Sequence, residues 1–394
     1  MSGNEPMAAR PSAPTATRSP WWRMERRRLT RLMHDGRPRF VYHLATISRQ
    51  VRLLQQQLGS VDRLFYSMKA NPHTRILQVV AAHGLGVECV SLAEVRFARM
   101  VLGSRTPILF TPSFCAVEEY AEALQLGAEA VLDGPEPLEQ APQVFAGREV
   151  GLRIDLGRGA GHHAKVRTAG PASKFGHPID DLEPLVAALE HAGARVVGLS
   201  AHAGSGILDA GLWAESCRDL ATLRTRFETV RWLDLGGGLG VPERDGQQAL
   251  DLGRMEHELS RVKERLGGME LRLEPGRFFV SEAGVLVAPV TQVRRKSGVG
   301  YVGVATGMNS LIRPALYGAW HRIHNLTRLD ETPTGCWQIV GPICESGDVL
   351  GSDRPLPETR PGDLLVIENA GAYGAVLSSS YNLRSPAEEH VLDG

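Results

Sequence analysis

The stretch Val61-Asp-Arg-Leu-Phe-Tyr-Ser-Met-Lys69-Ala-Asn-Pro72 decides the interpretation of this chain. Its apolar run over residues 64–68 predicts a buried strand, which Asn71-Pro72 ends. Lys69 therefore stands where a strand ends and a pocket can begin. Burying an ammonium is costly, so a lysine here is useful if its pKa is lowered and its amine attacks a carbonyl to form a Schiff base. The alternative is a lysine that extends to solvent.

Strands and helices alternate from this lysine onward. Helical segments are expected at residues 75–83, 92–102, 182–192 and 212–227. The eight expected strands are residues 64–68, 86–90, 108–111, 130–133, 150–155, 196–202, 231–235 and 270–274. Eight strands interleaved with helices over roughly 230 residues predict an α/β fold of the (β/α)8 TIM-barrel type. A doubly wound parallel sheet is the alternative.

The chain divides into four predicted parts. Residues 1–20, rich in Ala, Pro, Ser and Thr, are expected to be a disordered tail. Residues 21–46 hold a helix, with a solvated arginine face, and a strand that joins the last domain. The barrel spans residues 47–284. Over residues 285–394 the helical period fades and strand patterns predict a mostly β domain; its expected strands are residues 285–293, 301–304, 336–340 and 364–368.

Composition excludes several classes of partner. The 394 residues include 44 Lys and Arg against 44 Asp and Glu, a balance that gives no reason to expect a nucleic acid or an anionic membrane. No apolar run is long enough to span a membrane. The five cysteines form no CxxC pair, which argues against a disulfide framework or a zinc site and suits the reducing cytoplasm.

Reactive and flexible residues follow the predicted barrel strands. In such barrels the chemistry lies on the loops after the strands, and phosphate is often bound after strands seven and eight. Glu88 closes the second expected strand, and His202 follows the sixth, in Ala201-His-Ala-Gly-Ser205. Gly236-Gly-Gly-Leu-Gly240 follows the seventh and Glu274-Pro-Gly-Arg277 the eighth. A purely structural pattern would not collect these groups at one end.

Each group has a plain alternative. The glycine run lets backbone amides approach an anion, lacks the GxGxxG spacing of a dinucleotide site, and by itself could be a simple turn. His202 could be a core histidine or lie flat against a cofactor ring. Glu274 could be a surface charge or hold a proton on a heteroaromatic nitrogen. Together with Lys69 they predict a pyridoxal 5'-phosphate site, in which the cofactor's ring accepts electrons from a broken bond at the substrate's α-carbon.

The motifs resemble those of the alanine-racemase-like pyridoxal phosphate decarboxylases, most closely the diaminopimelate decarboxylases and the decarboxylase half of bifunctional aspartokinase–decarboxylase proteins. The resemblance covers nearly the whole chain from about Trp21. Besides the segments above, it rests on Gly161-His-His163, Ser173-Lys-Phe-Gly176, Arg313-Pro-Ala-Leu-Tyr317, Cys344-Glu-Ser-Gly-Asp348 and Ala370-Gly-Ala-Tyr373-Gly.

The resemblance implies a role for each matching residue. Lys69 would hold the cofactor, His202 would stack on its ring and Glu274 would pair with the pyridine nitrogen. Two further groups would surround the cofactor phosphate and bind the substrate's distal carboxylate. The residues expected around the phosphate are Ser205, Gly237, Gly238, Arg277 and Tyr373. The residues expected to bind the distal carboxylate are Arg277, Arg313 and Tyr317. Cys344 and Glu345 would reach into the site of the other subunit of a homodimer.

The residue types suit that chemistry. Two arginines can clamp a carboxylate in a bidentate way that lysine cannot. A thiol at Cys344 can return a proton to the carbanion, and Glu345 can accept the distal ammonium, although Cys344 could instead be a small buried hydrophobe. The other four cysteines are expected to be packing residues, and His162 and His163 to belong to a lid rather than a metal site.

The predicted reaction is decarboxylation of meso-2,6-diaminopimelate to L-lysine. A paralogue acting on another amino acid, or on a siderophore or antibiotic intermediate, is the main alternative. The substrates of simple diamine-forming enzymes have no distal carboxylate, so Arg313 and Tyr317 would have nothing to bind. A non-catalytic cofactor carrier tends to lose the lysine or the proton donor, which this chain keeps, and a racemase is disfavoured by Cys344-Glu345.

Overall fold

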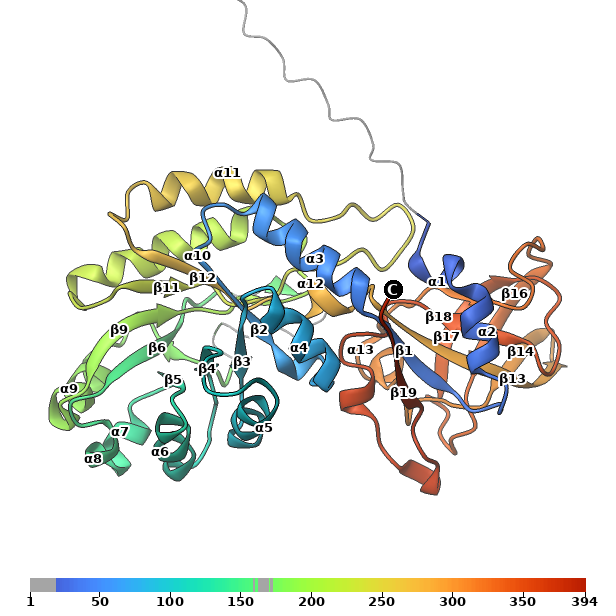
Figure 1. The fold of residues 1–394 in the computed structure, drawn as a ribbon, viewed down its shortest axis with the longest axis horizontal. Coiled ribbons are helices and arrows are strands. Elements are labelled where there is room, and N and C mark those ends of the chain that lie inside the picture. The colour runs from blue at the N-terminus through green and yellow to red at the C-terminus, as the bar shows by residue number, and fades with distance from the viewer. Residues whose placement is uncertain (1–18, 159, 162–169, 171–172) are drawn as a thin grey trace, which may run out of the picture.

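The computed structural model describes residues 19–158, 160–161, 170 and 173–394. The expected tail up to residue 18, and His162 with His163, lie outside the described residues. The described chain forms a barrel and, beside it, a β-rich unit that contains both the first and the last strand of the sequence (Figure 1).

The barrel is a closed ring of eight parallel strands. They are β2 (Arg63–Ser67), β3 (Gly86–Cys89), β4 (Ile108–Phe110), β5 (Glu129–Leu132), β6 (Glu149–Asp155), β9 (Arg195–Ser200), β11 (Trp232–Asp234) and β12 (Glu270–Leu273). Each pairs with the next in this order, and β12 pairs back with β2. The closure confirms the predicted (β/α)8 barrel and rules out the doubly wound sheet.

Helices surround the ring (Figure 1). They include α3 (Leu44–Gln57), α4 (Thr74–Ala82), α5 (Leu92–Leu102), α6 (Val117–Gln125), α7 (Glu136–Gln140), α8 (Pro142–Phe145), α9 (Glu183–Ala192), α10 (Gly211–Thr222) and α11 (Leu252–Lys263). Local signals set their ends. In α5 the Ser91 hydroxyl accepts a hydrogen bond from the Glu94 N–H, and Gly103 ends the helix at a φ of 73°.

Alternate strand residues fill the barrel interior, as the two-residue period of a strand requires. Phe65, Leu109, Val131 and Trp232 form a buried cluster there. A Cβ on Gly198 would lie 2.0 Å from the Trp232 ring, so a glycine is needed opposite this indole. The other strand face packs against the helices in the main hydrophobic core.

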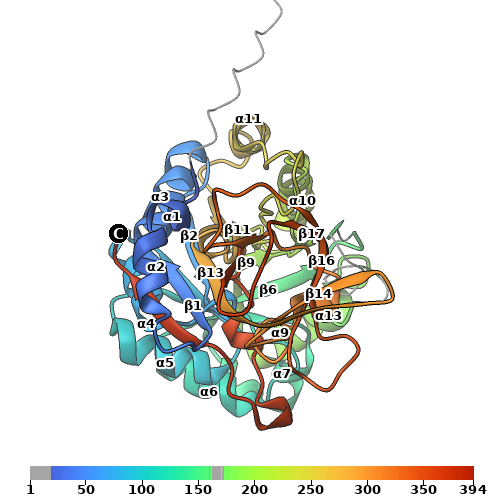
Figure 2. The same cartoon turned by 90° about the vertical axis from the view of Figure 1, so that its right-hand side faces the viewer.

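The second unit is a mixed β sheet. Its strands are β1 (Arg39–His43), β13 (Gly284–Lys296), β14 (Val299–Val304), β15 (Ile323–Asn325), β16 (Gly335–Val340), β17 (Val349–Leu356), β18 (Leu364–Ile367) and β19 (Glu388–Leu392). The N-terminal strand β1 pairs antiparallel with β13 and parallel with β19. Figure 2, viewed from the side of this sheet, shows it standing in front of the barrel.

Two details differ from the sequence-based expectations. The N-terminal helix is broken at Glu25 into α1 (Trp21–Met24) and α2 (Arg26–Leu32), because Glu25 has non-helical ψ. Cys89 and Cys217 are buried as expected, but Cys336 is exposed on β16. The packing role expected of Cys336 is therefore wrong, since the alternation of this strand turns its side chain outward.

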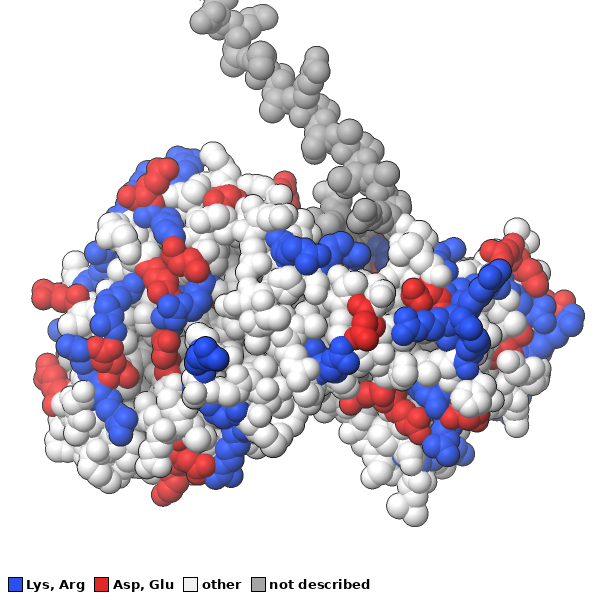
Figure 3. All heavy atoms as spheres, in the orientation of Figure 1, with Lys and Arg blue, Asp and Glu red and all other residues white. Residues whose placement is uncertain are grey.

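The surface has the mixed character that the charge balance predicts. Lys and Arg alternate with Asp and Glu over the visible face, and neither sign dominates it (Figure 3). None of the helices in the described ranges is long and apolar enough to cross a membrane.

Candidate active site

Lys69 lies on a short turn that follows β2. The turn, η1 (Met68–Ala70), is a single 3-10 segment. The Tyr66 hydroxyl donates to the Asn71 carbonyl over 2.8 Å, and the Tyr373 N–H donates to the Ala70 carbonyl over 2.9 Å. Because the second contact comes from the β-rich unit, both parts of the chain fix the position of the lysine.

The Lys69 amine is paired with a buried carboxylate. Its Nζ donates to Glu88 Oε1 over 2.7 Å, and the Thr111 hydroxyl donates to the same oxygen over 2.6 Å. Burial alone would lower the pKa of Lys69, but the charge of the paired Glu88 carboxylate raises it above its ordinary value. The expected lowering of the Lys69 pKa is therefore wrong for the chain on its own.

A cavity of about 330 Å³ opens at this lysine. Its walls come from the carboxyl ends of neighbouring barrel strands, where this fold places its chemistry. The lining residues are Lys69, Glu88, Val90, Thr111, Ser113, Arg153, Lys174, Phe175, Ser200, His202 and Glu274. The structure thus brings together three of the predicted residues, Lys69, His202 and Glu274.

Two of these lining groups are held in defined protonation states. His202 Nδ1 accepts a hydrogen bond from the Gly237 N–H over 3.1 Å. Burial lowers the pKa of His202 to about 3, and the cations Arg153 and Lys69 add to the effect, so the ring is neutral at neutral pH. Burial raises the pKa of Glu274 well above its usual range, with further contributions from Asp234 and Glu88. Oε1 of Glu274 is buried and has no hydrogen-bond partner among the described residues.

The glycine run is required by the close approach of three loops. A Cβ on Gly237 would lie 2.2 Å from the Glu274 carbonyl, and one on Gly238 would lie 2.4 Å from the Gly204 carbonyl. Gly238 also has a φ of 86°, which side chains rarely allow. The loops after β9, β11 and β12 can therefore meet only if these positions are glycines.

Arg277 stands at the junction of these loops. Its Nη2 donates to the Ser205 hydroxyl over 3.1 Å, and its guanidinium carbon lies 5.0 Å from the centre of the Tyr373 ring. Nε and Nη1 of Arg277 are buried without a partner in the described part of the chain. Tyr373 has a φ of 56°, a strained conformation of the kind that clusters at functional sites. Arg277 thus offers buried donors suited to an anion.

Arg313 is a second buried arginine at this site. It begins helix α13 (Arg313–Tyr317) and is 1% exposed. Its Nη2 donates to Glu243 Oε1 over 3.1 Å and its Nη1 lies 3.1 Å from His321 Nε2. Burial and the charge of Arg313 lower the pKa of Arg277 to about 10, so the two guanidinium groups act on each other. Tyr317 is half-buried at the end of the same helix.

The structure does not bring Cys344 and Glu345 into this cavity. Both are exposed in the loop between β16 and β17. The Cys344 N–H donates to the Asn382 side chain over 2.7 Å, and the Tyr381 hydroxyl donates to Glu345 Oε1 over 2.7 Å. Asp348 fixes the base of the loop by accepting from the Ile343 N–H over 2.7 Å.

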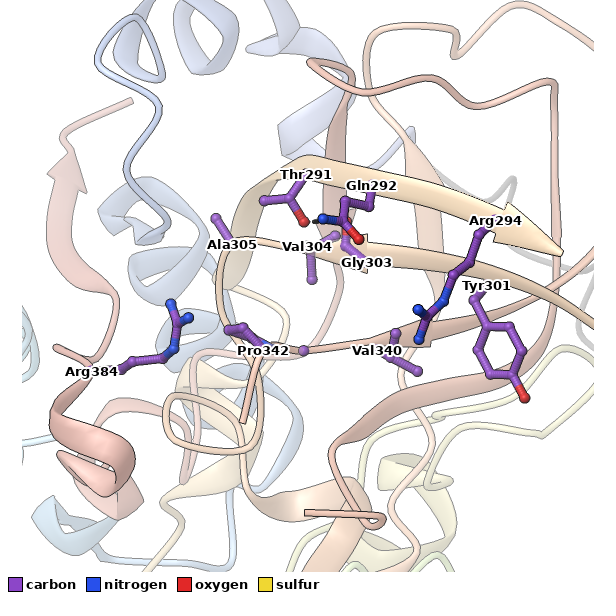
Figure 4. A pocket seen from close by; sticks show the side chains of 11 residues that line it. Thr291, Gln292, Arg294, Tyr301, Gly303, Val304, Ala305, Val340, Pro342 and Arg384 are labelled. Carbon is purple, nitrogen blue, oxygen red and sulfur yellow. Dashed lines mark hydrogen bonds between the residues drawn. The ribbon is translucent and has the colours of Figure 1, made fainter. Parts of the chain in front are cut away.

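A second cavity, of about 390 Å³, lies beside this loop. Arg384 stands at one end of it and Arg294 with Tyr301 at the other (Figure 4). Pro342 and Gly341 form part of its wall. None of the predicted site residues lines this cavity, so it is separate from the one at Lys69.

Comparison with known proteins agrees with this geometry. Residues 44–281 match the family model described as "Pyridoxal-dependent decarboxylase, pyridoxal binding domain". The chain belongs to the pyridoxal-dependent decarboxylase family. It is 34% identical over 383 residues to the diaminopimelate decarboxylase of Streptomyces coelicolor, covering 91% of this chain and 85% of that protein. It is 35% identical over 374 residues to the diaminopimelate decarboxylase of Pseudomonas aeruginosa, covering 91% and 88%.

Solved structures give the same family. The crystal structure of diaminopimelate decarboxylase from Helicobacter pylori complexed with L-lysine has a TM-score of 0.85 and 28% identity, and the match covers 93% of this chain and 94% of that one. A lysine/ornithine decarboxylase from Vibrio vulnificus shares the fold, with a TM-score of 0.82 at 21% identity, covering 94% and 97%.

The residues fit the cofactor of this family, pyridoxal phosphate. The amine of Lys69 faces a cavity, and burial raises the pKa of Glu274, whose Oε1 has no partner among the described residues. Among the same residues, Arg277 has two buried donors without a partner, beside the glycine loops. Sequence reasoning did not assign roles to Glu88, Glu243 or His321. Glu88 closes an expected strand and could have been found from its place at the barrel rim, but Glu243 and His321 carry no motif signal.

Proposed function

We propose that this chain decarboxylates meso-2,6-diaminopimelate to L-lysine and carbon dioxide. The observation that carries the proposal is a pair of buried, mutually interacting arginines, Arg277 and Arg313, the first of which follows the cavity residue Glu274 by three positions. An amino acid with one carboxylate at the reacting end has no use for such a pair. A substrate with a second, distal carboxylate gives both guanidinium groups an anion to bind.

The barrel residues would hold the cofactor. Lys69 would bind it through its amine, His202 would lie against its ring, and Glu274 would hold a proton toward the ring nitrogen. The groups around its phosphate would be Ser205, Gly237, Gly238, Arg277 and Tyr373. When bound, pyridoxal phosphate supplies an electron sink for the bond that breaks at the substrate's α-carbon.

Neighbouring residues would tune these groups. Burial, with the nearby charges of Asp234 and Glu88, raises the pKa of Glu274, so this carboxyl would have a proton to share with the ring nitrogen. His202 presents an uncharged ring because its Nδ1 accepts the Gly237 N–H and cannot also carry a proton there. A neutral ring at this place does not repel the positive charge that Glu274 would place on the ring nitrogen.

The distal carboxylate of the substrate would be bound by Arg277, Arg313 and Tyr317. Arg277 offers Nε and Nη1, the donors that lack a partner among the described residues. Holding the distal carboxylate would leave the reacting carboxylate free to depart beside the apolar side chains of Val90 and Phe175, which line the cavity.

The exposed loop would complete the site of a second copy. Cys344 would return the proton to the α-carbon after carbon dioxide leaves, and Glu345 would accept the distal ammonium. A homodimer with shared sites explains why these two residues stand at the surface of the single chain. We place this dimer in the cytoplasm, since its cysteines are unpaired.

Carbon dioxide release from a panel of amino acids tests the proposal. We expect meso-diaminopimelate to be preferred over L-lysine, L-ornithine and L-arginine by at least about 100-fold in kcat/KM, because a site built for a polar group rejects ligands that lack it. Lys69→Ala should abolish both the cofactor absorbance and the activity. Preference for a substrate without a distal carboxylate would favour the paralogue hypothesis instead.

A further inference from the structure

Glu243 is a partly buried carboxylate that belongs to none of the motifs quoted above. It follows the glycine run on the loop after β11, and the loop is held in place. Gln247 Oε1 accepts from the N–H groups of Glu243 and Arg244 over 2.9 and 3.3 Å, and the Asn369 side chain donates to the Pro242 carbonyl over 3.3 Å. The position of Glu243 is therefore fixed from both sides.

Glu243 is the counter-charge of Arg313. Their side chains meet at 3.1 Å and are 19% and 1% exposed. The other contact of Arg313 is neutral: His321 Nδ1 donates to the Glu368 carbonyl, so its Nε2 carries no proton and accepts from Arg313. In the described part of the chain, the ion pair formed by Arg313 is the one with Glu243.

Arg277, Arg313 and Glu243 form one electrostatic cluster. The charges of Arg313 and Glu243 both act on the pKa of Arg277, the first lowering and the second raising it. The hydrogen-bond partner of Arg277 is the neutral hydroxyl of Ser205. Two guanidinium groups and one carboxylate leave the cluster with a net charge of one positive unit, which a single carboxylate would cancel.

We propose that Glu243 is a specificity-determining residue: by offsetting one guanidinium charge, it lets the distal pocket accept a substrate end that carries both a carboxylate and an ammonium. The inference rests on the proposed function of Arg277 and Arg313. Without Glu243 the pocket would hold two net positive charges, which attract a bare carboxylate more strongly and repel an ammonium. A merely structural ion pair between the barrel loop and the β-rich unit would make no such distinction.

Two ligands separate the charges of the distal end. L-lysine has the distal ammonium alone, and L-2-aminopimelate has the distal carboxylate alone. Their Kd values are measured by calorimetry on the holoenzyme of the wild type and of Glu243→Gln. We expect Kd for L-lysine to rise about fivefold or more, as loss of one nearby charge at an intermediate dielectric implies, and Kd for L-2-aminopimelate to stay equal or fall. The ratio of Kd for L-lysine to Kd for L-2-aminopimelate therefore rises.

Asp245→Asn is the matched control, because Asp245 carries the same charge two residues further along the chain but its side chain is 95% exposed. The ratio of the two Kd values in this variant should stay within about twofold of the wild-type ratio. Arg313→Gln should move the ratio in the opposite direction, which keeps the test decisive if Glu243→Gln fails to fold. Equal changes of both constants in Glu243→Gln, or no change, would overturn the proposal. Turnover of meso-diaminopimelate by the wild type reports separately on the proposed function.

Discussion

The carboxylate of Glu88 lies 2.7 Å from the amine of Lys69, with Glu88 fully buried behind it. At such a distance and an effective dielectric of about 20, opposite charges attract by several kcal/mol. The pair therefore holds Lys69 as an ammonium in the cofactor-free protein. An ammonium cannot attack an aldehyde, so we predict that Glu88 limits how readily Lys69 reacts with the cofactor.

Replacing this carboxylate should make the lysine more reactive toward the cofactor. In Glu88→Gln the counter-charge is lost while burial remains, so the pKa of Lys69 falls. We expect cofactor capture by the apoprotein at pH 7 to be about tenfold faster or more, since each pKa unit is a tenfold change in free amine. Stopped-flow absorbance after mixing with pyridoxal phosphate at a series of pH values measures this rate and the pH at which it is half of its maximum.

Thr111→Val is the control, because it removes a hydrogen bond to the same Glu88 oxygen and leaves the charge. The pH of half-maximal capture should move far less in Thr111→Val than in Glu88→Gln. Slower capture by Glu88→Gln at every pH would show that Glu88 acts chiefly as the base that removes the lysine proton.

Cys344→Ala should separate cofactor binding from turnover. Cys344 is exposed and is not among the residues that line the cavity at Lys69, so cofactor absorbance should be unchanged. Loss of a positioned acid should slow kcat by about 100-fold or more. Cys336→Ala changes another exposed thiol, on β16, and should leave kcat as it is. Normal turnover by Cys344→Ala would remove the thiol from the mechanism.

Mixing two inactive variants tests whether sites are shared between chains. A dimer of one Lys69→Ala and one Cys344→Ala chain contains one site with both the native lysine and the native thiol. Random exchange makes half the dimers mixed, each with one intact site, so about a quarter of wild-type activity should return. Co-expression with two affinity tags allows the mixed dimer to be purified and assayed. An inactive mixed dimer would place both residues in the same chain's site.

Sequence patterns predicted the barrel well because its signals are local. Residues 92–102 carry a Ser91 cap, a helical apolar period and a terminal Gly103, and α5 spans the predicted residues. The strands β15, β17 and β19 were missed because their patterns are weak. β17 contains Gly351, Asp353 and Pro355, and β19 begins with two glutamates, so long-range pairing rather than propensity defines them.

The site was predictable to the extent that it follows strand ends. Lys69, His202 and Glu274 all lie after barrel strands and meet at one cavity. The partners of Arg313 could not be found this way. Glu243 and His321 are 70 and 8 residues from it in sequence, and they meet only because a barrel loop packs on the β-rich unit.

The close approach at Gly237 gives a prediction about the loops. A Cβ there would lie 2.2 Å from the backbone carbonyl of Glu274, and backbone cannot yield as a flexible side chain can. Gly237→Ala should therefore lower the free energy of unfolding by about 1–3 kcal/mol and weaken cofactor binding. Gly253→Ala is the control: its nearest neighbour would be 3.5 Å away and it lies in α11, so it should stabilise by up to about 1 kcal/mol. Urea unfolding with a cofactor titration compares them, and equal stability of Gly237→Ala and wild type would contradict the predicted clash.

Protonation of His321 should make stability depend on pH in a defined window. Burial, aided by the charge of Arg313, lowers the pKa of His321 to about 3. The unfolded chain binds this proton near pH 6.5 and the folded chain does not, so stability is complete above that pH and falls as pH decreases toward 3. His321→Asn lacks this contribution, whereas both proteins share every other titrating group. The stability advantage of wild type over His321→Asn should therefore shrink by about 2 kcal/mol between pH 7 and pH 5. Urea unfolding of both proteins at pH 5, 6 and 7 measures it, and a difference that stays constant over this range would show that His321 accepts a proton in the folded state.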